Sequence, residues 1–174
     1  MSPLFVATMK TSGVRKAEEF ANEVKTSLGA AWLPAIYIER VRGKRSRSYR
    51  FDGANAKAKT EIQHTLLGVE LKVGRRRMLC PDLATARYLA IFARAGCESV
   101  AVPYDITRIS QLADELESSW YRMFLLIDHH AADKSEAFRT RIGRLLVDKM
   151  KTEVTELGAG SSVPEFKQTT KQRS

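Results

Sequence analysis

The chain has 174 residues, 44% of them hydrophobic and 28% charged, a composition that excludes disordered and fibrous proteins and fits one globular domain. No apolar run approaches the length of a transmembrane helix, and the N-terminus lacks the layout of a secretion signal. We therefore expect a cytoplasmic protein without a membrane partner. Two cysteines, Cys80 and Cys97, are expected to be reduced and buried.

The net charge of +9 is concentrated in one segment. Residues 40–77 hold twelve basic and three acidic residues, a balance of +9, so the rest of the chain is neutral. Clustered charges of one sign repel unless a polyanion meets them, and nucleic acid is the commonest polyanion in a cell. A solvated basic face and a surface for an acidic protein are the alternatives. The residues expected to bind nucleic acid are Arg40, Arg42, Lys44, Arg45, Arg47, Arg50, Arg75, Arg76 and Arg77.

The N-terminal third is predicted to form a helix and a basic hairpin. Apolar residues recur at helical spacing over residues 13–28, and Gly29 is placed to end that helix. Residues 34–41 are rich in β-branched and aromatic side chains, which favours a strand. Gly43 separates this segment from residues 46–51, which we interpret as the returning arm of the hairpin.

A strand with one charged face follows. Residues 52–59 are typical of a turn, and residues 61–73 form one long strand or two short ones, with Gly68 as a candidate bulge. Residues two apart on a strand lie on the same face, about 6.6 Å from each other. Glu70 and Lys72 therefore point together, away from the apolar face of the strand.

This pair of side chains can carry metal-dependent chemistry. The Glu70 carboxylate can bind a hard divalent ion such as Mg²⁺, and the Lys72 ammonium can offset the charge of a pentavalent phosphate or activate water. A second carboxylate has to complete the metal site, and Asp52 and Glu61 are the candidates.

The centre of the chain predicts an α/β fold. Pro81 and Asp82 suit the first turn of a helix, which Gly96 ends. Residues 99–104 are almost wholly apolar, as in a strand that is covered on both faces. A strand, a helix and a buried strand in succession predict a crossover unit, and hence a mixed sheet with flanking helices.

The C-terminal part is predicted to be a helical hairpin. Apolar residues keep a spacing of three and four over residues 109–127 and again over residues 138–154. We expect this hairpin, within residues 107–157, to pack on the sheet or to join two copies in a homodimer. Residues 1–157 thus form a single domain, and residues 158–174 a flexible basic tail.

Residues 13–104 resemble the PD-(D/E)XK nuclease superfamily, which includes restriction endonucleases, Holliday-junction resolvases and VRR-type nucleases. The likeness consists of the leading helix with its acids, the hairpin, the sequence VELK that ends at Lys72, the following helix and the buried strand. The resemblance implies a restriction endonuclease-like core and an Mg²⁺-dependent endonuclease that hydrolyses phosphodiester bonds in DNA.

The resemblance also implies roles for individual residues. Glu70 would be a metal-binding acid and Lys72 the catalytic lysine. Asp52, or in its place Glu61, would be the first acid of the motif and a second metal ligand. Glu19 or Glu23 would supply the acid found on the leading helix of some members.

Two functions follow from these observations. The first is a metal-dependent nuclease acting on DNA, with catalytic residues Glu70, Lys72 and Asp52. The second is a non-catalytic nucleic-acid-binding or assembly module, which uses the basic hairpin to bind the backbone and needs no metal.

Overall fold

The computed structural model describes residues 3–51 and 59–159, with side chains from Lys16 onward. The helices are α1 (Pro3–Leu28), α2 (Leu33–Tyr37), α3 (Leu83–Ala95), α4 (Ile109–His130) and α5 (Glu136–Leu157). Shorter helical turns are η1 (Gly29–Ala31), the π-helix η2 (Ile38–Arg42) and η3 (Ile106–Arg108). The strands are β1 (Ser46–Arg50), β2 (Thr60–Thr65), β3 (Gly68–Val73), β4 (Arg76–Cys80) and β5 (Ser99–Pro103).

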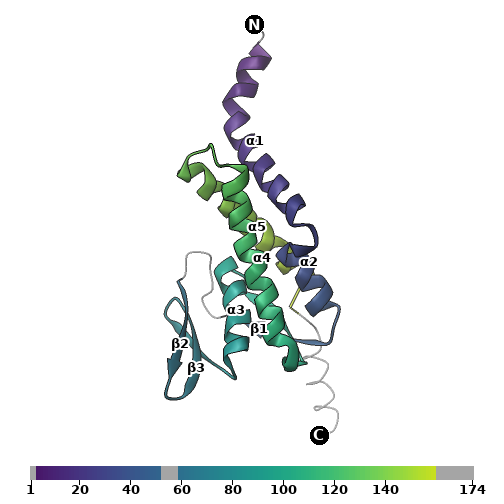
Figure 1. Ribbon diagram of the computed structural model, residues 1–174, viewed down its shortest axis with the longest axis vertical. Helices are drawn as coiled ribbons and strands as arrows, with labels where there is room; N and C mark the ends of the chain where they lie inside the picture. Colours follow the sequence, from purple (N-terminus) through teal and green to yellow (C-terminus); the bar gives the residue numbers. More distant parts are fainter. Residues whose placement is uncertain (1–2, 52–58, 160–174) are drawn as a thin grey trace.

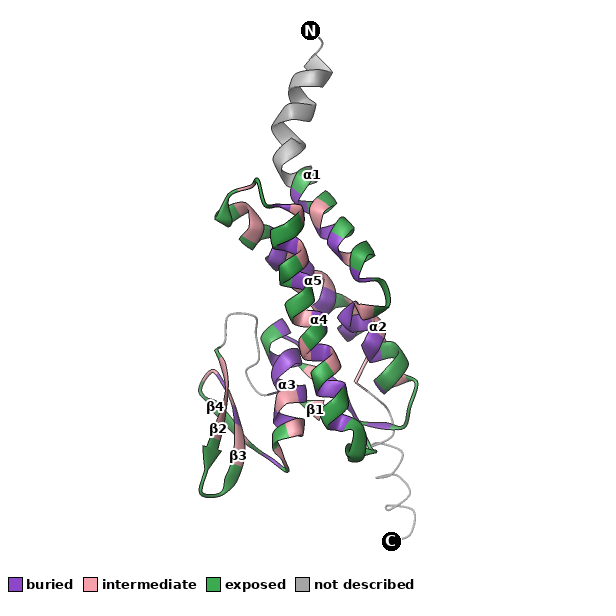
Figure 2. Cartoon of the chain, viewed as in Figure 1, coloured by how far each residue is buried: buried purple, intermediate pink, exposed green. Residues whose placement is uncertain are grey.

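The strands lie toward one end of the molecule, beside α3 and the first part of α4, and α1 extends toward the other end (Figure 1). The long helices α1, α4 and α5 pack on one another, and α3 packs on α4 and α5 while it also covers β2 and β3 (Figure 1). Buried faces of these elements form one hydrophobic core (Figure 2). The mixed α/β class and the C-terminal helical hairpin are thus confirmed.

Local sequence signals explain the ends of two helices. The Asp82 carboxylate accepts a hydrogen bond of 2.7 Å from the backbone N–H of Thr85 and caps α3. Gly96 ends α3 at a φ of 84°, a left-handed conformation that favours glycine. Ser135 caps α5 through a hydrogen bond from the N–H of Phe138. The predicted helix that begins at Pro81 and Asp82 is confirmed.

The strand predicted over residues 34–41 is wrong, because this segment is helical in α2 and η2. Pro34 lies in the first turn of α2, where its missing N–H costs nothing. Leu33, Ile36, Tyr37 and Val41 are all buried, and their spacing of three and four places them on one helical face. Burial of that face outweighs the β propensity of the segment.

The basic hairpin is wrong as well. Residues 46–50 do form a strand, β1, but it pairs antiparallel with β5, from Ser46 opposite Pro103 to Arg50 opposite Ser99. The cations expected on one hairpin therefore lie on η2, on the loop after it and on β1.

The predicted crossover unit is also absent from the described residues, in which every strand pairing is antiparallel. Helix α3 connects β4 to β5, yet these strands belong to different sheets. Side chains take the place of a further strand beside β5. The N–H of Ala101 donates to the Tyr37 hydroxyl at 2.8 Å, and its C=O accepts from the Tyr88 hydroxyl at 2.6 Å. Both backbone groups are satisfied, so no parallel neighbour is needed.

The second sheet is a meander of β2, β3 and β4. Residues 61–73 form two strands joined by a turn at Leu66 and Leu67, and Gly68 pairs regularly with Thr65 rather than forming a bulge. The strand β4 was not predicted. The inner face, which includes the buried Leu71 and Val73, packs on α3.

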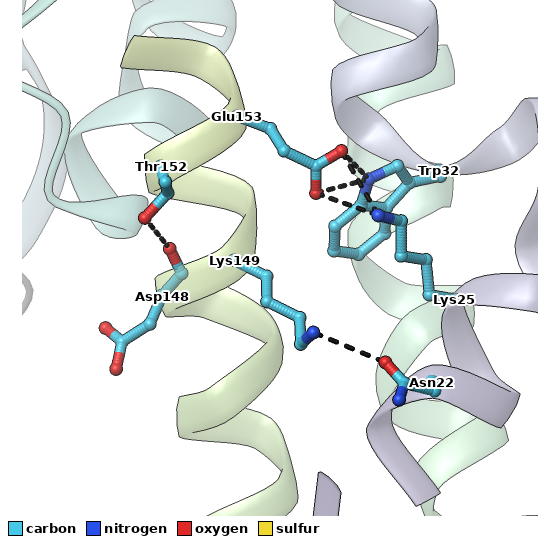
Figure 3. A network of polar contacts seen from close by, with 7 residues as sticks. All are labelled: Asn22, Lys25, Trp32, Asp148, Lys149, Thr152 and Glu153. Carbon is cyan, nitrogen blue, oxygen red and sulfur yellow. Dashed lines mark hydrogen bonds and ion pairs between the residues drawn. The ribbon is translucent and has the colours of Figure 1, made fainter. Parts of the chain in front are cut away.

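The leading helix α1 begins at Pro3 rather than near residue 13, and it ends before Gly29, whose φ is 54°. Polar contacts tie this region to α5 (Figure 3). Glu153 accepts hydrogen bonds from Lys25 Nζ and from the indole N–H of Trp32, each at 3.2 Å to the nearer oxygen. Lys149 Nζ also donates to the Asn22 side chain at 3.3 Å.

Candidate nucleic-acid interface

The polar face of the meander brings the predicted pair together with two further polar side chains. In the strand register Glu61 lies opposite Lys72, and Gln63 lies opposite Glu70. Directly opposed residues of antiparallel strands share a face, so all four lie on the face away from α3. Glu61 and Glu70 are diagonal neighbours, which places their Cα atoms about 7–8 Å apart.

A lysine and an amide side chain orient the Glu61 carboxylate. Its Oε1 lies 2.8 Å from Lys59 Nζ, and the Gln63 amide donates to its Oε2 at 3.5 Å. The hydrogen bond and charge of Lys59, and then the charge of Lys72, lower the pKa of Glu61. The carboxylate is therefore ionised and is oriented on the same face as Glu70.

Glu70 has an unsatisfied oxygen. Its Oε2 is shielded from solvent and accepts no hydrogen bond from any residue that the structure describes. A shielded carboxylate oxygen without a donor is costly, and a bound cation is one way to satisfy it. This oxygen and the Glu61 carboxylate are the hard donors that Mg²⁺ prefers, and Mg²⁺ sites often contain only one or two carboxylates.

Other expected acids do not complete this site in the described structure. Asp52, the predicted catalytic and metal-binding residue, lies outside the described residues, as does the predicted tail beyond residue 159. Glu23 Oε2 lies 3.8 Å from His130 Nδ1, at the C-terminal end of α4, so Glu23 does not reach the meander. Glu19 is exposed on α1, which packs on α4 and α5. Within residues 3–51 and 59–159, no group of three or more His, Cys, Asp or Glu side chains is arranged to hold a metal.

Three of the predicted nucleic-acid-binding residues have other partners. Arg40 forms an ion pair with Glu115 of α4. Arg42 Nε donates to the C=O of Leu157 at 2.9 Å. The Arg45 guanidinium lies over the ring of Tyr104, 5.1 Å from its centroid.

The other six predicted cations are exposed, and none forms an ion pair with a described residue. They are Lys44, Arg47, Arg50, Arg75, Arg76 and Arg77. Two belong to β1, and three to β4 and the turn before it. The hydroxyl of Tyr49 in β1 donates to the sulfur of Met78 in β4, so the two sheets that carry these cations meet at this contact.

The charge pattern missed Tyr104 and Arg108. Both contribute to a cleft beside Lys44 and Arg45, although they follow the basic segment by more than 25 residues. Nothing in the local sequence around them marks a binding site, because the contact depends on the long-range pairing of β1 with β5.

Neither a membrane-spanning helix among the described residues nor a known relative was found. Among the described residues, no helix is both long enough and apolar enough to cross a membrane. Comparisons with models of protein families, with curated proteins and with solved structures find no significant match for this chain.

Proposed function

We propose that the protein binds nucleic acid, with the exposed cations of β1, β4 and the neighbouring loops on backbone phosphates. The observation that carries the proposal is the set of six exposed cations without an ion pair to a described residue. The Tyr49–Met78 contact supports a shared surface, because it joins the two sheets on which most of these cations lie. Such a surface binds phosphates with little dependence on sequence.

The test is fluorescence anisotropy with labelled DNA and RNA of one sequence. If six phosphates are contacted, affinity falls roughly 10³-fold between 50 and 200 mM salt. The triple variant Arg75→Ala, Arg76→Ala, Arg77→Ala is expected to bind more weakly and with a shallower salt dependence.

A matched control removes the same charge elsewhere. Lys16, Arg122 and Arg141 are exposed on α1, α4 and α5, and their combined replacement by Ala also lowers the net charge by three. This control variant should bind nearly as well as the wild type. Equal weakening by both triple variants, or binding that barely responds to salt, would contradict the proposal.

Glu70 favours a second candidate, a metal-dependent nuclease that hydrolyses phosphodiester bonds in DNA. Its shielded Oε2 lacks a donor among the described residues, and Glu61 lies diagonally across the same face. In this candidate Glu70 and Glu61 hold Mg²⁺, which supplies a Lewis acid for the phosphate and lowers the pKa of the attacking water. Lys72, opposite Glu61, offsets the negative charge of the pentavalent phosphate.

If the protein is such a nuclease, its fold should contain a restriction endonuclease-like core. The order of α1, the meander with the Glu-x-Lys strand, α3 and the buried β5 supports it. The pairing of β5 with β1, rather than with the meander, weighs against it. For this reason nucleic-acid binding is the primary proposal.

Cleavage assays with Mg²⁺ or Mn²⁺ separate the two functions. A nuclease should cut labelled DNA, and Glu70→Gln or Lys72→Met should lower the rate at least tenfold while circular dichroism stays unchanged. Glu18→Gln, an exposed change on α1, is the control and should cut normally. Cutting by both site variants at the wild-type rate would exclude this active site, whereas binding without cutting would leave only the primary proposal.

A further inference from the structure

A cleft of about 520 Å³ opens between the loop that follows η2 and the segment that joins β5 to α4. Its volume lies within the range of sites that take small organic molecules. The walls come from residues 40–45 and 103–112, two segments that the β1–β5 pairing brings together. A backbone hydrogen bond of 3.1 Å from Tyr104 N–H to Arg45 C=O extends that pairing to the edge of the cleft.

Positive charge dominates the cleft. Among its lining residues, Lys44 and Arg108 are exposed and form no ion pair with a described residue. Arg40 also lines it, but its charge is offset by Glu115. The acidic lining residue Asp105 accepts hydrogen bonds from the N–H and the hydroxyl of Thr107, at 3.1 and 2.5 Å. Both bonds end on Oδ1 and lower the pKa of Asp105. Lys44, Arg45 and Arg108 still outnumber this one carboxylate in the lining.

An apolar and aromatic surface lies beside these cations. Pro103 and Leu112 are buried lining residues, whereas Tyr104 is 39% exposed. The Arg45 guanidinium over the Tyr104 ring adds a second planar group. Aromatic rings and guanidinium planes are the surfaces on which unpaired bases stack. Gln111, also in the lining, carries an amide that can both donate to and accept from the edge of a base.

We propose that this cleft binds one unpaired nucleotide of a single-stranded nucleic acid. The base lies against Tyr104 and Arg45, and an adjoining phosphate contacts Lys44 and Arg108. The inference rests on the proposed nucleic-acid binding and narrows its ligand, because the bases of a duplex are stacked on one another and do not enter such a cleft. It also extends the interface to Tyr104 and Arg108, which lie outside the basic segment.

The experiment compares a labelled single-stranded oligonucleotide with a duplex of the same length. Tyr104→Leu should weaken single-strand binding about tenfold, the range of one lost base–aromatic stack, and leave duplex binding unchanged. Tyr104→Phe keeps the ring and should bind like the wild type. Thr26→Leu is the control and should bind single strands like the wild type, because Thr26 is exposed on α1 and is absent from the cleft lining.

Further measurements distinguish a strand from a free nucleotide as the ligand. They also distinguish failure of the cleft inference from failure of the proposed nucleic-acid binding. A nucleoside monophosphate, titrated by calorimetry, should bind far more weakly than the oligonucleotide; equal affinity would identify a site for free nucleotides and overturn the inference. If the wild type binds strands and Tyr104→Leu changes nothing, the cleft inference alone is wrong. If the wild type binds no nucleic acid, the proposed function and the inference are both wrong.

Discussion

Two tyrosine hydroxyls form hydrogen bonds with the backbone of one residue of β5, Ala101. The Tyr37 hydroxyl accepts from Ala101 N–H and donates to the C=O of Gly158 at 2.6 Å, while the Tyr88 hydroxyl donates to the C=O of Ala101. Desolvation raises the pKa of Tyr37 to about 12 and that of Tyr88 well above its ordinary value. Both phenols are therefore protonated at neutral pH.

Removal of the Tyr37 hydroxyl should destabilise the fold. Tyr37→Phe leaves the N–H of Ala101 and the C=O of Gly158 without their side-chain partner, which should cost about 1–3 kcal/mol of unfolding free energy. Urea denaturation measures this loss. Tyr104→Phe changes an exposed phenol and should leave stability unchanged; an equal effect of both variants would show that the buried contacts contribute nothing.

The same hydroxyl makes stability depend on alkaline pH. The pKa of Tyr37 is about 12 in the folded protein and near 10 when unfolded. Its contribution is complete below pH 10 and is lost as the pH rises through 12, because the unfolded chain releases the proton first. The urea midpoint of the wild type should therefore fall more steeply over this range than that of Tyr37→Phe. Parallel curves would contradict this assignment.

Burial should also protect both thiols. Desolvation raises the pKa of Cys97 to about 11 and raises that of Cys80 as well, which lowers the fraction of reactive thiolate. At pH 8 the Cys97 thiolate is roughly 100-fold scarcer than in an ordinary thiol. A thiol reagent should label the native protein slowly and both cysteines rapidly in urea. Fast native labelling would mean that the surrounding core opens readily.

At the scale of elements, a few polar contacts supplement the apolar packing of α1 and the turn after it on α5. Trp32 is 4% exposed, and its indole N–H donates to Glu153. Lys25 donates to the same carboxylate, but this ion pair is more than a third exposed on the lysine side and is screened by solvent. The indole bond is therefore the more important of the two.

Substitution of Glu153 distinguishes these contributions. Glu153→Ala removes the acceptor of a buried N–H and should cost about 1–3 kcal/mol of unfolding free energy. Glu153→Gln keeps an acceptor oxygen for Trp32 and should cost less than half as much. Glu156→Ala, an exposed change on the same helix, serves as the control. If Gln and Ala are equally destabilising, the ion pair with Lys25 carries the energy instead.

Elements with local determinants were predictable from the sequence. The cap at Asp82, the stop at Gly96 and the apolar run of β5 each depend on a few adjacent residues. Residues 34–41 were mispredicted because burial of Leu33, Ile36 and Tyr37 overrides the β propensity of the segment. The β1–β5 pairing joins residues more than 45 positions apart, and strand propensity does not specify partners.

The candidate site was likewise predictable only in part from the sequence. Alternation along β3 predicted the shared face of Glu70 and Lys72, and the hairpin register then added Glu61 and Gln63 to it. Charge counting located the basic segment, but it could not distinguish Arg40, which pairs with Glu115, from the exposed Arg47. That distinction depends on which distant carboxylates the fold brings close.

At the scale of the whole molecule, the C-terminal half of α4 carries exposed apolar side chains, and this part of the helix lies away from the meander (Figure 2). Tyr121 and Leu125 are 71% and 67% exposed. The neighbouring Phe124 lines a cavity of about 730 Å³ between α4 and α5. Gly143 allows α5 to approach closely, since a Cβ there would lie 3.2 Å from the Phe124 ring. Three arginines and three acids line the cavity around its apolar residues.

This mixed lining is self-complementary in charge, which supports the homodimer predicted from the C-terminal helices. Arg139 and Asp128 already form an ion pair within one copy at 3.7 Å. In a two-fold dimer Arg94 and Arg144 of one copy can face Glu136 and Asp148 of the other, while the exposed apolar side chains of α4 become buried. Sedimentation equilibrium should then give a dimer without nucleic acid, and Leu125→Glu should shift it to a monomer. Thr26→Glu, an exposed change on α1, should remain dimeric. A wild-type monomer at high micromolar concentration would contradict the prediction and leave nucleic-acid binding unaffected, because the exposed cations of β1 and β4 lie on other elements.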